Sequence, residues 1–277
     1  MERRIEKEEL HSIYYSRFDL FHNFLVKHNI KYYAMGGTLL GAIRHNGIIP
    51  WDDDMDIIML REDYERFLLV ANELDKDLFE VVNYRTRKYI EHPLTKIALV
   101  GVINKNATVG KKFDRHYHID IFPVDCIYKN NKKQTKIIKS VKRLKMILYF
   151  KSRALSHPNI IKRLLTLMIK VFLIPISCKF ACKKYDRIVQ KANKTNNGNG
   201  DVLWTSGGIY SFERETHKLE TYGVPTIHAF GTTSIFVPQN PNQFLIDTFG
   251  PNYMKPMKRG NEDSFYCVLT DDFVKTN

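Results

Sequence analysis

A glycine-rich turn and an acidic cluster lie close together in residues 35–60, and this pairing constrains the chain more than any other feature. The stretch reads MGGTLLGAIRHNGIIPWDDDMDIIML. Gly36 and Gly37 let the backbone approach a phosphate closely. Thr38 is placed to cap the apolar helix that follows, whose free N–H groups would face an anion. The first half of the stretch therefore predicts a phosphate site.

The second half of the stretch carries four aspartates in five positions, residues 52–56, and runs into the apolar residues 57–60. These apolar residues have the length and composition of a buried strand. On an extended chain Asp52, Asp54 and Asp56 project to one side. Three like charges at the mouth of a buried strand repel by several kcal/mol at low dielectric, so we expect a cation there. Mg²⁺ fits best because it prefers oxygen ligands and shares them with substrate phosphates, and Mn²⁺ is the alternative ion.

Two other interpretations of the acidic cluster stay open. A calcium-binding loop could start at Asp52, but it would need glycine in place of Ile57 and glutamate in place of Asp63. The cluster could also be a solvated turn that merely precedes a strand. The glycine turn just upstream favours the metal site over both.

A second acidic motif, residues 118–125 (HIDIFPVD), supplies another carboxylate. Asp120 is flanked by isoleucines inside a strand-like run, where an unpaired carboxylate costs several kcal/mol. We therefore expect Asp120 to be a further metal ligand. The alternative is an exposed aspartate on an edge strand that ends at Pro123. We expect Asp125, which follows the proline, to cap or turn the chain.

The remaining pattern predicts helices and strands in a mixed order. Helical periodicity covers residues 8–28, 61–74 and 132–194, and strand-like runs cover residues 31–35, 79–84, 94–103, 202–210 and 222–237. The loop at residues 193–200 is the best candidate boundary. We predict a catalytic core over residues 1–128, a basic helical segment over 129–200, and a strand-rich segment over 201–277 that completes the same domain.

Positive charge is concentrated in one segment of the chain. The net charge is +13, and residues 129–194 hold 19 Lys and Arg but a single acidic residue, Asp186. Helices with this composition could lie on an anionic membrane surface or attract a polyanionic acceptor, or their lysines could simply be solvated. A nucleic-acid-binding protein is the rival class. It is disfavoured because the basic stretch lacks interleaved exposed aromatic residues and the aspartates would repel a nucleic-acid backbone, so we expect no nucleic-acid partner.

The sequence also suggests a compartment. The four cysteines form no Cys-x-x-Cys pair and no disulfide framework, and the charged N-terminus lacks the apolar core of a signal peptide. The longest apolar stretch, residues 164–176, is well short of about 20 residues. We expect a cytoplasmic protein that contacts the inner face of the plasma membrane peripherally.

The motifs together resemble a known family. The order and spacing of three motifs, GGTLLGAIRH, IPWDDDMDI and IDIFPVD, resemble those of the LicD family. This family belongs to the nucleotidyltransferase superfamily of the DNA polymerase β type. It is related to fukutin and fukutin-related protein. Residues 236–254 are similar to the family's closing segment. The resemblance implies a mixed α/β fold with a mixed sheet flanked by helices, into which the basic helices are inserted.

The resemblance also implies an activity and a set of roles. Such an enzyme moves a phosphocholine, glycerol phosphate or ribitol phosphate group from a CDP-activated donor to a sugar hydroxyl, and CMP is released. The acceptor would be a cell-surface polysaccharide or teichoic acid precursor, which we expect to be lipid-linked. The rival enzyme class is a nucleotidyltransferase that transfers NMP to a small molecule. The metal ligands would be Asp52, Asp54, Asp56 and Asp120. Of these, Asp54, Asp56 and Asp120 would be catalytic, with Asp120 accepting the proton of the attacking hydroxyl. Gly36, Gly37 and Thr38 would bind the phosphates, and Arg44 and Lys96 are either further substrate-binding residues or ordinary surface charges. Trp51 could stack on the donor or pack behind the aspartates, and no residue set names the alcohol.

Overall fold

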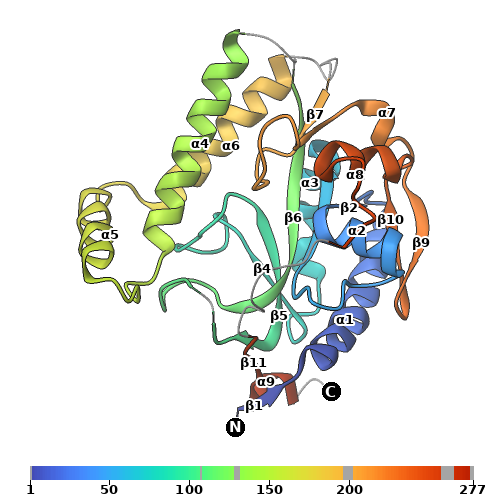
Figure 1. Cartoon of the computed structure of the whole chain (residues 1–277), viewed down its shortest axis with the longest axis horizontal. Coiled ribbons are helices and arrows are strands. Elements are labelled where there is room, and N and C mark those ends of the chain that lie inside the picture. Colours follow the sequence, from blue (N-terminus) through green and yellow to red (C-terminus); the bar gives the residue numbers. More distant parts are fainter. Residues whose placement is uncertain (1, 107, 128–131, 196–201, 257–264, 275–277) are drawn as a thin grey trace.

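A mixed β-sheet with helices packed around it forms the body of the protein, and a two-stranded hairpin lies beside it (Figure 1). The structure is a computed structural model that describes residues 2–106, 108–127, 132–195, 202–256 and 265–274. Within these ranges the sheet contains parallel and antiparallel pairs. The predicted mixed α/β class is therefore confirmed.

Strands and helices are interspersed along the described chain. The strands are β1 (Arg3–Ile5), β2 (Tyr33–Ala34), β3 (Met55–Leu60), β4 (Phe79–Val82), β5 (Thr95–Asn104), β6 (His116–Ile127), β7 (Val202–Trp204), β8 (Thr216–His217), β9 (Thr226–Phe230), β10 (Thr233–Val237) and β11 (Cys267–Leu269). The helices are α1 (Lys7–Lys27), α2 (Gly36–His45), α3 (Arg61–Val70), the 3₁₀ helix η1 (Ala71–Glu73), α4 (Lys132–Ser152), α5 (Ile160–Phe172), α6 (Cys178–Thr195), α7 (Leu219–Tyr222), α8 (Pro241–Phe249) and α9 (Asp271–Val274).

Strand β6 is the centre of the sheet. The order of strands is β1-β11-β5-β6-β3-β2, with β4 paired to β5 and with β7 joining β6 to β8. The alternative that Asp120 lies on an edge strand is therefore wrong. Pro123 does not end the strand. The pairing of β6 with β5 ends at Ile121, so no hydrogen bond to β5 is lost because proline has no N–H.

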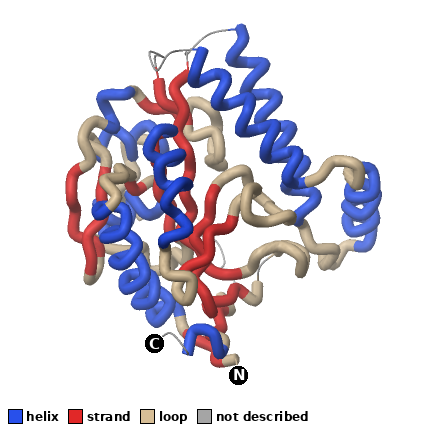
Figure 2. Tube along the Cα trace, turned by 180° about the vertical axis from the view of Figure 1, so that it is seen from behind, coloured by secondary structure: helices blue, strands red, loops and turns tan. Residues whose placement is uncertain are grey.

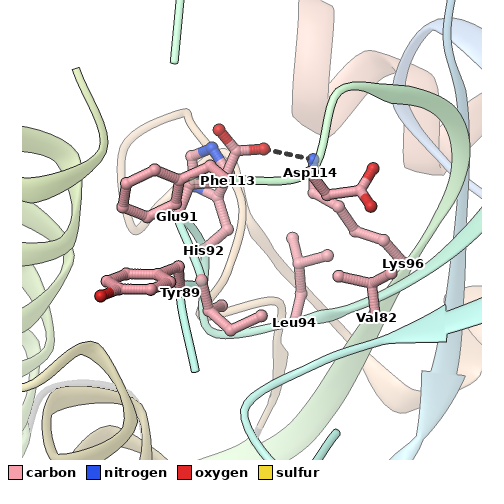
Figure 3. A pocket seen from close by; sticks show the side chains of 9 residues that line it. Val82, Tyr89, Glu91, His92, Leu94, Lys96, Phe113 and Asp114 are labelled. Atoms are coloured by element: carbon pink, nitrogen blue, oxygen red, sulfur yellow. Dashed lines mark hydrogen bonds and ion pairs between the residues drawn. The ribbon is translucent and has the colours of Figure 1, made fainter. Parts of the chain in front are cut away.

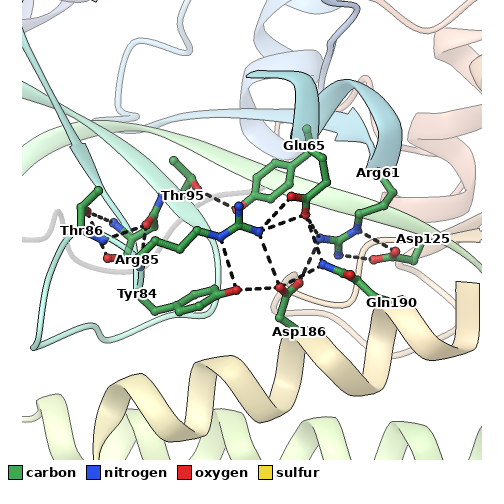
Figure 4. A network of polar contacts seen from close by, with 11 residues as sticks. Arg61, Glu65, Tyr84, Arg85, Thr86, Thr95, Asp125, Asp186 and Gln190 are labelled. Atoms are coloured by element: carbon green, nitrogen blue, oxygen red, sulfur yellow. Dashed lines mark hydrogen bonds and ion pairs between the residues drawn. The ribbon is translucent and has the colours of Figure 1, made fainter. Parts of the chain in front are cut away.

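Asp125 lies inside β6 and pairs with Arg61, so the prediction that it caps or turns the chain is wrong. The Arg61 guanidinium, at the start of α3, donates to the two Asp125 oxygens over 2.8 and 2.6 Å and to Asp186 over 3.0 Å. Asp186 also accepts from the Tyr84 hydroxyl at 2.7 Å. This network joins α3, β6 and α6 (Figure 4).

Helix α1 covers the sheet as its periodicity predicts. Its buried face includes Leu10, Tyr14, Phe18, Phe21 and Leu25, all at three- or four-residue steps. The helix packs beside the hairpin of β9 and β10 (Figure 2).

The basic segment forms three helices. Helices α4 and α6 pack on each other and share a second hydrophobic cluster with β7, while α5 stands apart from the body (Figures 1 and 2). Helix α6 extends through Thr195, and the rest of the predicted boundary loop lies outside the described residues. The strands predicted over 202–210 and 222–237 are shorter than expected, and β7, β8 and β11 join the main sheet. The three-part division of the chain stays a prediction.

Candidate active site

A cleft of about 490 Å³ brings the glycine turn and both acidic motifs together. Of the residues predicted for the site, the cleft is lined by Gly36, Gly37, Arg44, Asp52, Asp54, Asp56 and Asp120. Thr38 and Lys96 do not line it. The structure thus places two acidic motifs, more than sixty residues apart in the chain, around one space.

Strand register puts three charged side chains next to one another. Asp56 on β3 lies opposite Asp120 on β6 in a parallel pair, and Lys96 on β5 lies opposite Asp120 in an antiparallel pair. Side chains of directly opposed residues point to the same face of a sheet. The Lys96 ammonium is 3.7 Å from Asp120 Oδ2, so Lys96 reaches the site through Asp120.

The glycine turn sits directly against the aspartates. Helix α2 begins at Gly36, whose φ is +54°, a left-handed conformation that favours glycine. A Cβ atom on Gly37 would come within 2.5 Å of Asp52 Oδ2, and one on Gly36 within 3.4 Å of Asp56 Oδ2. A side chain at Gly37 would therefore displace the Asp52 carboxylate or the helix start, whereas at Gly36 it is the backbone conformation that favours glycine.

The prediction that Thr38 caps the helix is wrong. The capping position is Met35, which provides no side-chain hydrogen bond, and Thr38 lies within the first turn. The Thr38 hydroxyl instead accepts the backbone N–H of Asp56 over 2.8 Å. Thr38 thereby fixes the start of β3 relative to α2.

Helix α1 holds the acidic loop that precedes β3. The buried Tyr14 hydroxyl donates to the backbone carbonyls of Asp53 and His118 over 3.3 and 3.0 Å, which ties the two acidic motifs to each other. His11 Nε2 lies 2.7 Å from the backbone oxygen of Asp52. The sequence offered only the aromatic stripe of α1, so this positioning role of Tyr14 was not predicted.

The electrostatics of the cleft favour an added positive charge. Burial, followed by the charges of Asp52, Asp53 and Asp120, raises the pKa of Asp54 to about 7. The Asp54 side chain is open to the cleft, but the surrounding protein restricts the water around it. Burial and the charges of Asp54 and Asp120 likewise raise the pKa of Asp56 well above its ordinary range. Repulsion among these carboxylates is the cost that a cation would relieve.

The donor set suits a cation that prefers oxygen ligands, although it is not gathered around a single point. Asp120 Oδ1 is shielded from solvent and has no hydrogen-bond partner among the described residues. Among the residues that the structure describes, no three His, Cys, Asp or Glu side chains lie close enough together to hold a metal ion in their present positions. The carboxylates therefore fit Mg²⁺ or Mn²⁺ by chemistry, and would have to turn toward the ion to bind it.

A small pocket beside the cleft contains the ion pair of Lys96 and Glu91 (Figure 3). Lys96 donates to Glu91 there over 2.7 Å. Burial alone would lower the pKa of Lys96, but Asp120 and Glu91 outweigh it and hold this pKa above its ordinary value. His92 lines both the pocket and the cleft, and its pKa is lowered by burial and by Lys96. Neither Glu91 nor His92 was predicted, because the sequence around them carries no motif.

Aromatic residues form the wall of the cleft away from the sheet. Tyr210 and Phe249 pack edge to face at 5.8 Å, and both line the cleft with Trp51. The Arg44 guanidinium lies 5.9 Å from the Trp51 ring centroid and donates to the backbone oxygen of Tyr253 over 3.2 Å. Trp51 is 38% exposed, so one part of its ring is open to the cleft. Of these residues, Trp51 and Arg44 belong to the sequence motifs, whereas Tyr210 lies outside them.

The raised pKa of Asp54 predicts a gain in stability when its charge is removed. Its folded-state pKa of about 7 exceeds its ordinary value of about 4, so without metal the contribution of Asp54 to stability should become unfavourable as pH rises from about 4 to 7. In chelator at pH 8, Asp54→Asn should melt on the order of 2–4 °C higher than wild type, and the difference should vanish near pH 4. Thermal unfolding followed by circular dichroism measures both.

Added Mg²⁺ provides the matching control. It should raise the melting temperature of wild type at pH 8 and raise that of Asp54→Asn much less, because a bound ion stabilises the folded state by mass action. An equal Mg²⁺ response in both proteins would remove Asp54 from the ligand set.

Comparison with known proteins agrees with this geometry. Residues 29–158 match the domain described as "LicD/FKTN/FKRP, nucleotidyltransferase domain". The match covers the part of the chain that contains α2, β3 and β6. The identification of the LicD family from the sequence motifs is confirmed.

Individual relatives match over the same part of the chain. The lipopolysaccharide cholinephosphotransferase LicD of Haemophilus influenzae is 34% identical over 129 residues, which are 46% of this chain and 48% of that protein. An uncharacterized protein of Rickettsia prowazekii is 52% identical over 122 residues, 42% of this chain and 46% of that protein. Human ribitol 5-phosphate transferase FKRP is 53% identical over 34 residues, 12% of this chain and 7% of that protein. The chain thus spans less than half the length of these relatives.

Proposed function

We propose that this protein is a phospho-alcohol transferase that modifies a cell-surface glycan precursor. The observation that carries the proposal is the register of β3 and β6, which sets Asp56 beside Asp120 in a cleft bordered by Gly36 and Gly37. Glycine-lined helix starts and paired carboxylates are suited to diphosphates with a divalent ion. The donor would be a CDP-activated alcohol, and the product would be CMP.

The relatives support two candidate alcohols. One is named a cholinephosphotransferase acting on lipopolysaccharide and another a ribitol 5-phosphate transferase. Both names describe transfer of a phosphorylated alcohol. For this chain, choline and ribitol are the first candidates and glycerol is the third, with a lipid-linked glycan as acceptor.

The chain's own residues supply binding, orientation and proton transfer. The N–H groups at the start of α2 and the Arg44 guanidinium would bind the donor diphosphate, because both are positive groups on the cleft wall. Asp52, Asp54, Asp56 and Asp120 would hold Mg²⁺ or Mn²⁺, which when bound neutralises charge on the diphosphate. Asp120 would accept the proton of the attacking sugar hydroxyl, as Lys96 and Glu91 hold its side chain in place.

The bond changes follow from this arrangement. The sugar oxygen attacks the phosphorus that carries the alcohol and forms a new P–O bond. The bond between that phosphorus and the bridging oxygen of the diphosphate breaks, and the bridging oxygen leaves with CMP. The hydroxyl proton goes to Asp120, and the lost carboxylate charge reduces repulsion with Asp56.

A donor comparison tests the proposal. The protein is incubated with Mg²⁺, a membrane extract that contains lipid-linked glycans, and CDP-choline, CDP-ribitol or CDP-glycerol in turn, and CMP is measured. One donor should give acceptor-dependent CMP release at least tenfold above the other two. Release of CMP from none of them, with the folded state verified by circular dichroism, would contradict the proposal.

Gly37→Ala should impair the reaction through Asp52. Its Cβ would lie 2.5 Å from Asp52 Oδ2, closer than two non-bonded atoms can approach, so the carboxylate or the first turn of α2 must shift. We expect kcat to fall by about 10²-fold with little change in stability. Gly110→Ala is the control, since a Cβ there meets no atom closer than 3.7 Å, and it should retain wild-type kcat. Equal activity of both variants would show that the cradle tolerates a side chain.

A nucleotidyltransferase is the second candidate, and the description of the matched domain favours it. In that reaction the nucleotide phosphorus would be attacked instead. The same cleft would hold the same diphosphate, so the position of bond cleavage distinguishes the two candidates.

A further inference from the structure

Helix α5 (Ile160–Phe172) has none of its residues buried, although nine of its thirteen residues are apolar. A surface helix normally turns its apolar face to the core and its charged face to water. Helix α5 stands out from the body beyond α4 (Figures 1 and 2). Its apolar face is therefore directed at something other than this chain's core.

The apolar side chains of α5 form one continuous stripe. Residues 161, 165, 168 and 172 recur at steps of three and four, which places them on one side of the helix. The exposed fractions are 72% for Ile161, 55% for Leu165, 68% for Met168 and 84% for Phe172. Ile174, just after the helix, is 70% exposed and adds apolar surface next to the stripe.

The opposite side of α5 is anchored to the body. Lys170 Nζ donates to the backbone oxygen of Arg153 over 2.5 Å, and Lys151 Nζ donates to the backbone oxygen of Leu173 over 2.8 Å. These bonds hold the polar side inward. The outward position of the stripe is thus a consequence of contacts at the C-terminal end of the helix.

The charge around the stripe selects the kind of partner. Residues 153–180 contain five Lys and Arg and no Asp or Glu. A second copy of this chain would bring the same positive charges to the contact and be repelled. An anionic lipid bilayer matches both the apolar stripe and the positive charge, because its interior is apolar and its headgroups are negatively charged.

The length of α5 defines how it would meet a bilayer. Thirteen residues of α-helix extend about 20 Å, which is shorter than the roughly 30 Å hydrocarbon core. In the described part of the chain, moreover, no helix combines the length and hydropathy that crossing a bilayer requires. The helix would lie along the interface, with its stripe in the acyl region and its basic residues among the headgroups.

We propose that α5 is a membrane-docking helix that binds anionic lipid surfaces. The inference rests on the stripe, its anchoring and its charge, and it holds whichever alcohol the enzyme transfers. Docking would bring the cleft to acceptors carried on lipid.

Vesicle binding tests the proposal directly. The full chain is co-sedimented with vesicles of phosphatidylglycerol and phosphatidylcholine, or of phosphatidylcholine alone. We expect at least tenfold stronger binding to the anionic vesicles, weakened by 0.5 M NaCl because headgroup attraction is screened. The triple variant Ile161→Asn, Met168→Asn, Phe172→Asn should bind at least tenfold more weakly with an unchanged melting temperature.

A matched triple variant controls for the loss of exposed apolar area in general. Leu69→Asn, Val224→Asn, Ile227→Asn removes side chains that are 80%, 68% and 67% exposed and lie on other elements. It should bind vesicles like wild type. Equal weakening of both triple variants would overturn the proposal.

A tryptophan probe reports insertion itself. Phe172→Trp should shift its emission to shorter wavelength on anionic vesicles, after subtraction of the signal of the two native tryptophans, and should be quenched by brominated lipid. The proposal would be overturned by an unshifted emission or by equal binding to uncharged vesicles. It would also be overturned if the chain bound no vesicles and formed a dimer that the α5 triple variant abolishes. CMP release from a detergent-solubilised acceptor should be unchanged in the α5 triple variant, so this test and that of the proposed function can fail separately.

Discussion

Replacement of Asp56 or Asp120 by asparagine should reduce CMP release by about 10³-fold or more without unfolding the protein. The two carboxylates face each other across the parallel pair of β3 and β6 and line the same cleft. Each substitution removes one negative charge from the proposed cation site, and Asp120→Asn also removes the proton acceptor. Losses of this size are typical when a group that acts in the transition state is deleted. Initial rates of CMP release, with circular dichroism as a check on folding, measure the effect.

Asp53→Asn is the matched control for these two variants. Asp53 lies in the same acidic loop but is not among the residues that line the cleft. It should retain activity within about threefold of wild type, because its side chain does not line the cleft and its charge is one of several that act on Asp54. Near-normal activity of Asp120→Asn would remove Asp120 from the reaction, whatever Asp56→Asn does.

Replacement of Arg61 by alanine should destabilise the fold by about 3–5 kcal/mol. Its guanidinium pairs with Asp125, which is 2% exposed, and with Asp186. Without Arg61 these carboxylates are left buried near one another with no compensating charge at Asp125. Burial alone would lower the pKa of Arg61, but the hydrogen bond and charge of Asp125 raise it above its ordinary value, so the guanidinium stays charged. Urea unfolding at neutral pH measures the loss.

Two further variants make this prediction specific. Arg66→Ala on the same helix breaks a pair with Asp63 in which the arginine side chain is 44% exposed, and it should cost no more than about 1 kcal/mol. Arg61→Lys keeps the charge but not the paired hydrogen bonds, and should fall between wild type and Arg61→Ala. Similar losses for Arg61→Ala and Arg66→Ala would show that the buried network contributes nothing special.

The sequence predicted the parts of the fold that depend on local pattern. The stripe of α1, the glycine turn at the start of α2 and the apolar strand β3 all follow from local residue patterns within one element. The grouping of Asp56 with Asp120 was predicted through the cost of burying an unpaired charge between isoleucines. That cost identifies Asp120 as a residue that needs a partner. The family motifs indicated that the partner is a metal ion shared with the first acidic motif.

The errors arose where a partner distant in sequence decided the structure. Asp125 was assigned to a turn because proline usually ends a strand, but Arg61, sixty-four residues earlier, pairs with it inside β6. Thr38 was assigned to a helix cap by local preference, but its hydroxyl accepts a hydrogen bond from the backbone N–H of Asp56. Periodicity within one element carries no information on such contacts.

The wall of the cleft could not be predicted for the same reason. Phe249 and Tyr253 lie in the segment that resembles the family's closing segment, but nothing local assigns them or Tyr210 to the site. Only the folded chain brings them around the same cleft as the aspartates. Glu91 and His92 lie between β4 and β5 in a stretch without regular structure. Their place next to Lys96 depends on the pairing of β5 with β6.

The position of bond cleavage tests the central claim most directly. A CDP-alcohol donor, identified by the comparison of donors, is labelled with one isotope on the nucleotide phosphorus and another on the alcohol phosphorus, and both products are analysed. Phospho-alcohol transfer predicts that CMP keeps the nucleotide label and the glycan gains the alcohol label. A product that carries the nucleotide label, with the alcohol phosphate released, would contradict the account and make the protein a nucleotidyltransferase.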